Sequence, residues 1–175
     1  MKVITHIYNL IIESRKSDIA HKHACIAFMN GTRITPYLHN YKRPYIYRCL
    51  VGTLHAEMNV LHHILIRAAL NGSNISHLFY NIYNNVKLTK SNISTLKKIK
   101  RKFSKISLFV VKSSNTLYNL GNSRPCITCL KMMKAFGIKN IYYSMPDYIM
   151  IESILHMETT HESNLSINMN KIIYT

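Results

Sequence analysis

Acidic residues are scarce in this chain: 7 of its 175 residues are Asp or Glu, whereas 23 are Lys or Arg, and the formal net charge is +16 at pH 7. So large an excess of positive charge attracts polyanions such as nucleotides, nucleic acids or anionic surfaces. The chain is also rich in Ile, Asn and Lys, which A+T-rich codons encode. Genome composition is therefore as good an explanation of the lysine excess as function is.

Long apolar runs are absent as well. None reaches the roughly 18 residues that a transmembrane helix needs, so we expect no membrane association. Residues 1–7 lack the apolar core and the cleavage site of a signal peptide. Cysteines number only 4, and nothing indicates secretion, which argues against a disulfide framework and favours an intracellular, reducing compartment. We expect Cys25 and Cys49 to be buried thiols.

Hydrophobic residues make up 47% of the chain, which is typical of a globular protein, and the length suits a single domain over residues 1–175. Apolar periodicity predicts helices over residues 2–16, 54–70, 91–103 and 126–136, and strands over residues 23–29, 33–38, 106–111, 139–144 and 148–155. Asn30-Gly31 is expected to close a hairpin. Helices that lie between strands predict an α/β fold with a mixed sheet covered on both faces.

The segments between these elements carry further predictions. Residues 39–53 form a loop rich in Tyr, Arg and Lys, and Thr53 is the expected N-cap of the helix that follows. Asn71-Gly72 is expected to end that helix. A basic insertion follows at about 73–104, and a polar tail begins at about 156. Pro125 stands where the first turn of a helix would begin.

Two short motifs, His55-Ala56-Glu57 and the sequence PCITC at residues 125–129, carry chemistry when they are taken together. A catalytic zinc ion takes about three protein ligands and leaves one position for water, and His55, Cys126 and Cys129 provide such a set. Both thiols lie at a predicted helix N-terminus, where backbone N–H groups and the helix dipole stabilise thiolates. Glu57 would project beside the metal and accept a proton from the attacking water.

Cys126 and Cys129, taken alone, would also fit a zinc ribbon or a redox pair. A zinc ribbon needs a second pair of cysteines, and Cys25 and Cys49 are badly spaced for that role. A redox pair would leave His55-Ala56-Glu57 without a purpose. The two motifs together follow the H-x-E…P-C-x-x-C pattern of zinc-dependent nucleobase deaminases.

The residues around both motifs extend this resemblance. SRPCITC at residues 123–129, followed by GIKNIYY at 137–143, resembles the second half of the cytidine/deoxycytidylate deaminase superfamily, and HAEMNVL at 55–61 resembles the first half in its CMP/dCMP type. The resemblance covers about residues 2–72 and 104–155. It implies a three-layer α/β/α sandwich with a mixed five-stranded sheet, and dimers or larger homo-oligomers. It also implies zinc on His55, Cys126 and Cys129, with the proton shuttle on Glu57.

Substrate contacts are also predicted. By resemblance, Asn40 would hold the sugar of a nucleoside, with an ordinary loop residue as the equal alternative, and Asn59 favours the mononucleotide branch. Arg43 and Arg48 lie among tyrosines in the 39–53 loop, which could stack a base and hold a phosphate. A packed loop without a ligand accounts for the same residues. The two motifs lie farther apart than in a minimal family member, and residues 73–104 hold the excess.

Three functions follow from these observations. The first is hydrolytic deamination of dCMP or CMP to the uracil nucleotide. The second is deamination within RNA or single-stranded DNA, with the cations of residues 97–102 as a binding surface. The alternative for these cations is an ordinary helix face exposed to solvent. The third is a basic nucleic-acid-binding or virion-packaged protein on a deaminase fold. A large DNA virus or a bacterial parasite with an A+T-rich genome would fit the composition, and a viral protein would work in the host cytoplasm or the virion.

Overall fold

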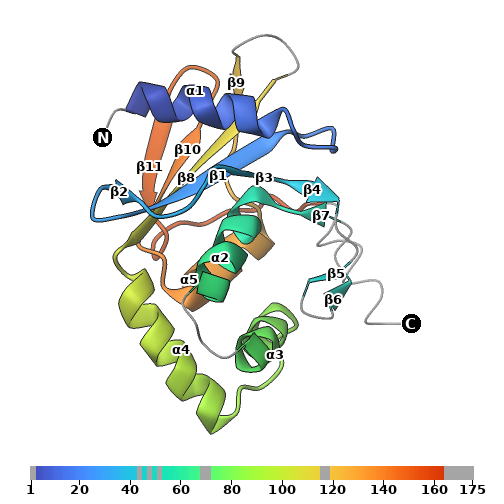
Figure 1. The fold of residues 1–175 in the computed structure, drawn as a ribbon, viewed down its shortest axis with the longest axis vertical. Coiled ribbons are helices and arrows are strands. Elements are labelled where there is room, and N and C mark those ends of the chain that lie inside the picture. Colours follow the sequence, from blue (N-terminus) through green and yellow to red (C-terminus); the bar gives the residue numbers. More distant parts are fainter. Residues whose placement is uncertain are drawn as a thin grey trace.

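The computed structural model describes residues 3–42, 45–46, 49–50, 53–67, 72–114 and 119–163. Figure 1 shows a sheet with helices on both of its faces. The helices are α1 (Val3–Ser14), α2 (Ala56–Arg67), α3 (Gly72–Tyr83), α4 (Lys90–Phe103) and α5 (Ile127–Phe136). The longer strands are β1 (His23–Met29), β8 (Ile106–Ser113), β10 (Asn140–Ser144) and β11 (Ile149–Ser153). Two-residue strands are β2 (Thr32–Arg33), β3 (Leu38–His39), β4 (Tyr41–Lys42), β5 (Tyr45–Ile46), β6 (Cys49–Leu50), β7 (Thr53–Leu54) and β9 (Leu120–Gly121).

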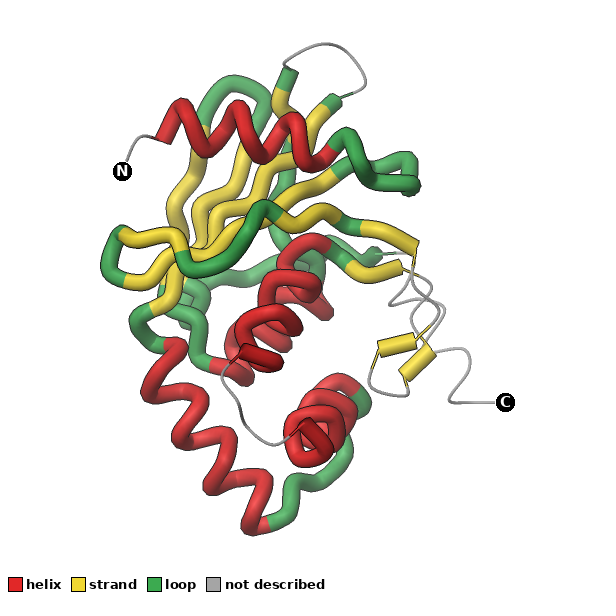
Figure 2. The backbone as a smooth tube through the Cα atoms, viewed as in Figure 1, coloured by secondary structure: helices red, strands yellow, loops and turns green. Residues whose placement is uncertain are grey.

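The main sheet is mixed, which confirms the predicted α/β class. Its strands follow the order β11-β10-β8-β1-β2, while β3 also pairs with β1 and β9 with β8. The β8–β10 pair is parallel and the other pairs of this sheet are antiparallel. The sheet therefore has 7 strands rather than the predicted five. The difference comes from β9 and from the division of one predicted strand, residues 33–38, into β2 and β3 (Figure 2).

The division of that strand has a local cause at Ala27 of β1. The Ala27 carbonyl accepts from the Ile34 N–H at 2.9 Å, whereas the Ala27 N–H donates to the Thr35 hydroxyl at 3.0 Å. A side chain thus replaces a backbone partner, and the register shifts between Phe28↔Arg33 and Ala24↔His39. Before this point the chain turns at Asn30 and Gly31. Both have positive φ, as the predicted hairpin requires.

Each face of the sheet carries its own hydrophobic cluster. On one face, Leu10 and Ile11 of α1 pack on alternate residues of β1 and β8, including Ile26 and Phe109. On the other face, α2 and α5 pack on the remaining residues of those strands, such as Cys25. Alternation of side chains along a strand explains this division.

The insertion between the two motifs is regular rather than loose. Its segments form α3 and α4, and the second of these confirms the predicted helix over 91–103. Phe79 of α3 and Phe103 of α4 both pack near Phe136 of α5, with ring centroids 6.2 and 6.3 Å away. The insertion therefore supports the helix that carries both candidate cysteine ligands.

Several predicted boundaries are wrong. Thr53 is not an N-cap, because it lies in β7, and α2 begins three residues later at Ala56. Gly72 does not end a helix but opens α3. The predicted loop at residues 39–53 contains short strands, since β4 pairs with β7 and β5 with β6. Propensity alone misses such short strands because partners elsewhere in the chain decide whether they form.

None of the helices in the described part of the chain has the length and apolar character needed to cross a bilayer.

Two glycines at positive φ allow a matched stability test. Gly137 caps α5 at φ 80°, and a Cβ there would lie 3.3 Å from the Lys100 Cα; Gly31 has the same φ, but a Cβ at that position would meet nothing within 4 Å. We expect Gly31→Ala to cost roughly 1–2 kcal/mol through its left-handed backbone alone. Gly137→Ala should cost more, because the backbone of α4 blocks the added methyl group. Thermal unfolding of both variants measures the difference, and equal costs would show that the contact with α4 has no effect.

Candidate metal centre

Three potential metal ligands meet where two helices begin. His55 directly precedes α2, while Cys126 and Cys129 lie at the start of α5. The Nδ1 of His55 lies 3.5 Å from the Cys126 Sγ and 3.3 Å from the Cys129 Sγ. All three ligand atoms lie within 4.8 Å of one another. The predicted ligands thus form a possible metal site, with Nδ1 as the histidine nitrogen that faces it.

Local backbone chemistry fixes both thiols. Cys126 is the N-cap of α5, and its Sγ accepts from the Cys129 N–H at 3.5 Å. A residue at an N-cap and the residue three positions later face the same end of the helix, so their sulfurs point to one place. Gly137 ends α5 in the left-handed conformation, as the sequence predicts. On the other side, the Asn59 N–H donates to the His55 carbonyl at 2.9 Å, which starts α2.

The geometry fits a small tetrahedral ion. Zinc–sulfur and zinc–nitrogen bonds of ordinary length place neighbouring S and N ligands about 3.6 Å apart. The observed separations of 3.5 and 3.3 Å are close to that value. Two sulfurs and one imidazole are a donor set that zinc favours, and three protein ligands leave a fourth position for a water molecule.

The electrostatics of the metal-free site favour one thiolate. Hydrogen bonds from the Cys129 thiol and from His55 lower the pKa of the Cys126 thiol to about 3, although burial opposes this. The interaction with Cys126, together with burial, raises the pKa of Cys129 well above its ordinary value. Burial would lower the pKa of His55, but the negative charge of Cys126 outweighs it and raises that pKa. A metal cation would stabilise both thiolates and release these protons.

Glu57 lies in the first turn of α2 and is only 5% exposed. Burial raises the pKa of its carboxyl group to about 7; the Cys126 thiolate adds to this, and His55 opposes it. A carboxyl group with a pKa near neutrality can both accept and donate a proton under physiological conditions. Glu57 therefore combines burial with a raised pKa, and its predicted role as the acid–base group stays a prediction.

A cavity of about 480 Å³ opens onto these residues. Its lining includes His55, Glu57 and Cys126 together with residues from β1, β8 and the C-terminal segment. This volume falls within the range of roughly 300–1,000 Å³ that is common for small-molecule sites. A small substrate could reach both the metal position and the buried carboxyl group.

The predicted substrate residues have different positions. Asn40 lines the cavity and is 4% exposed. Its amide already accepts from the His23 N–H at 2.8 Å and donates to the His21 carbonyl at 2.6 Å. Asn59 is outside the cavity lining and donates to the His39 carbonyl at 2.9 Å. The predicted roles of Arg43 and Arg48 fall on residues outside the described part of the chain.

The C-terminal segment is part of the site, and the sequence did not predict this. His161, Glu162 and Ser163 line the cavity, and the His161 carbonyl accepts from the Ile127 N–H at 2.9 Å. The Ile127 N–H has no acceptor within α5, and its hydrogen bond to His161 holds the segment in place. No periodic pattern in the polar tail signals this contact.

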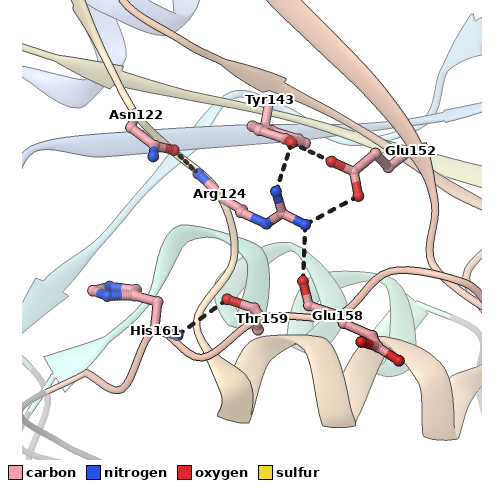
Figure 3. Close-up of polar contacts among 7 residues, drawn as sticks. All are labelled: Asn122, Arg124, Tyr143, Glu152, Glu158, Thr159 and His161. Atoms are coloured by element: carbon pink, nitrogen blue, oxygen red, sulfur yellow. Dashed lines mark hydrogen bonds and ion pairs between the residues drawn. The ribbon is translucent and has the colours of Figure 1, made fainter.

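Arg124 ties the same segment to the sheet. Its guanidinium group donates to the Glu158 carbonyl at 2.8 Å and forms an ion pair with Glu152 at 3.3 Å (Figure 3). The Tyr143 hydroxyl also donates to Glu152, so the three side chains form one network. Arg124 lies two residues before Cys126, and the network therefore fixes the entry to α5.

The chain matches no protein-family model, no curated protein and no solved structure.

Metal analysis tests the site directly. We expect about one zinc ion per chain in the freshly purified protein, and loss of that zinc in His55→Ala and Cys129→Ser, because each change removes a ligand. Cys25→Ser is the matched control, since Cys25 is a buried thiol that does not belong to the ligand group. Elemental analysis after gel filtration gives the stoichiometry. Metal-free wild-type protein that takes up no added zinc would refute the site.

Proposed function

We propose that this protein is a zinc-dependent deaminase that hydrolyses a cytosine nucleotide, dCMP or CMP, to the uracil nucleotide and ammonia. The observation that carries the proposal is the combination of two thiols and an imidazole around one point with a buried carboxyl group, Glu57, in the same cavity. This is the residue set that nucleobase deaminases use. The family resemblance of both motifs supports the same function.

The residues suggest how the reaction would proceed. Zinc, when bound, supplies Lewis acidity that lowers the pKa of a coordinated water towards neutrality. Glu57 accepts a proton from the water that attacks C4 of cytosine and delivers it to the ring nitrogen N3. It then transfers the second proton of that water to the departing amino group, which leaves as ammonia. Its raised pKa suits both directions of transfer.

The wider fold is compatible with this proposal. We infer the three-layer arrangement of the cytidine deaminase class, and the position of α1 on one face of the mixed sheet and of α2 and α5 on the other supports it. The two candidate half-sites then lie at neighbouring helix N-termini. Backbone N–H groups there add positive potential around the thiolates.

Substitution of Glu57 is the decisive test. In Glu57→Gln we expect ammonia release from dCMP or CMP to fall by about 10²–10⁴-fold, because the proton carrier is lost. Zinc content should remain near one ion per chain, since Glu57 is not a ligand in this proposal. Enzymatic detection of ammonia and elemental analysis measure the two quantities.

The matched control is Glu158→Gln, which removes an exposed carboxyl group outside the cavity lining and leaves the backbone carbonyl of that residue in place. This variant should retain most of the activity. The substrates to compare are dCMP, CMP, cytidine and a cytosine-containing oligonucleotide. Activity on the oligonucleotide alone would show that the substrate is a polynucleotide and not a mononucleotide. If zinc-loaded protein acts on none of the four compounds, the proposal is overturned.

One observation favours a second function, polynucleotide binding. Helix α4 has the sequence KSNISTLKKIKRKF, which contains no acidic residue. The cations at positions 97, 98, 100, 101 and 102 are all exposed, while Ile99 and Phe103 of the same helix are buried. None of the ion pairs among the described residues involves this helix. A face with several unpaired cations suits the phosphate backbone of RNA or DNA.

Salt dependence tests this second function. For single-stranded nucleic acid, each phosphate contact that is lost reduces the slope of log K against log salt by about 0.7. We expect the double variant Lys98→Gln/Lys102→Gln to weaken binding and reduce the slope by about 1.4. The control, Lys16→Gln/Lys42→Gln, removes two exposed cations outside α4. Equal weakening by both variants would indicate that net charge, and not α4, binds nucleic acid.

A further inference from the structure

Lys112 is a charged residue of the cavity that has no role in the proposed steps of deamination. It lies near the end of β8 and lines the cavity that contains the candidate metal site. In the pairing of β8 with β1 it lies opposite His23, two residue pairs from the Cys25↔Val110 pair. Alternate residues of a strand share a face, so Lys112 and His23 lie on the side of the sheet that α2 and α5 cover.

The neighbouring strand guides the Lys112 side chain. Gly121 of β9 is its partner on the other side, and a Cβ at Gly121 would lie 3.0 Å from the Lys112 Cδ and 3.5 Å from its Cε. The aliphatic part of the lysine therefore runs directly over the glycine. A larger residue at position 121 would displace it, so the glycine leaves room for this orientation of the side chain.

The ammonium group of Lys112 has no counter-ion in the described part of the chain. None of the ion pairs or hydrogen bonds that the structure records there involves its Nζ. The other strong cation of the cavity, Arg124, is already bound to Glu152 and to the Glu158 carbonyl. A partly buried lysine beside a cavity with no partner leaves a positive charge that an anionic ligand can neutralise.

Its neighbour, His23, adds a second polar function. The His23 Nδ1 lies 3.1 Å from the His21 carbonyl, which can only accept, so Nδ1 carries the hydrogen. In a neutral ring the Nε2 is then an acceptor for a hydroxyl or amino group. The cavity wall thus offers two groups to a ligand. Lys112 is a cation that can bind an anionic group, and the His23 Nε2 is an acceptor for a neutral hydrogen-bond donor.

From this arrangement we propose that Lys112 is the phosphate-binding residue of the substrate cavity. This inference rests on the proposed function and assigns to Lys112 the recognition of the phosphate that distinguishes its substrate from free cytidine or cytosine. The phosphate is that of a mononucleotide or one internucleotide phosphate of a polynucleotide, because a lysine recognises both in the same way. Gly121 is the positioning residue that keeps Lys112 directed along the wall.

Binding of reaction products tests the proposal without any need for turnover. The zinc-loaded full-length protein is titrated by calorimetry with dUMP, deoxyuridine and a short uracil-containing oligonucleotide. Lys112→Met keeps the aliphatic chain and removes the charge, and Lys112→Arg keeps the charge. The matched control is Lys139→Met, at an exposed lysine outside the cavity. Thermal unfolding of each variant verifies that it is folded.

We expect Lys112→Met to weaken dUMP binding by about tenfold or more, the usual effect of losing a charge-assisted hydrogen bond. The affinity ratio of dUMP to deoxyuridine should fall by a similar factor, and Lys112→Arg should restore most of it. Gly121→Ala should lower the same ratio, because it moves the side chain. Weakening confined to the oligonucleotide would assign Lys112 to an internucleotide phosphate.

Two results would overturn the inference: an unchanged affinity for both phosphorylated ligands, or an equal loss for dUMP and deoxyuridine. The second result would indicate a packing role for the lysine. Failure of the proposed function gives a different pattern. If no cytosine compound is deaminated but dUMP binding still depends on Lys112, the phosphate site stands and the deaminase assignment falls.

Discussion

The start of α5 is the constraint on which the rest of the site depends. The first N–H groups of a helix have no partner within it and need acceptors from elsewhere. Here the Cys126 sulfur accepts from Cys129, and the His161 carbonyl accepts from Ile127. One requirement of backbone chemistry thus brings both thiols to one point and holds the C-terminal segment over the cavity.

Packing around α5 makes this arrangement rigid. Phe79 and Phe103 of the insertion lie near Phe136 of α5, and the Arg124 network holds the entry to this helix. The insertion is therefore part of the scaffold of the site, although its exposed face carries the cations of α4. Support for the candidate metal ligands and a surface for polyanions are two roles that a single amphipathic helix can combine.

Groups of opposite charge line the same cavity. Glu57 lies buried beside the candidate ligands, Arg124 is occupied by structural contacts, and Lys112 lies on the sheet wall without a carboxylate partner among the described residues. The same cavity therefore contains both a carboxyl group suited to proton transfer and a positive charge that an anionic ligand could neutralise.

Local sequence determined the α/β class, the main helices and strands, and the candidate ligands, because apolar periodicity and the spacing of Cys126 and Cys129 are properties of short segments. It did not reveal the division into β2 and β3, the true start of α2 or the role of the tail. Those features depend on contacts that exist only in the folded chain, such as Thr35 with Ala27 across the hairpin and His161 with Ile127 at the start of α5. Lys112 shows the same limit: the sequence contains 23 Lys and Arg residues, and only the tertiary structure distinguishes this one, because cavity walls and missing counter-ions exist only after folding.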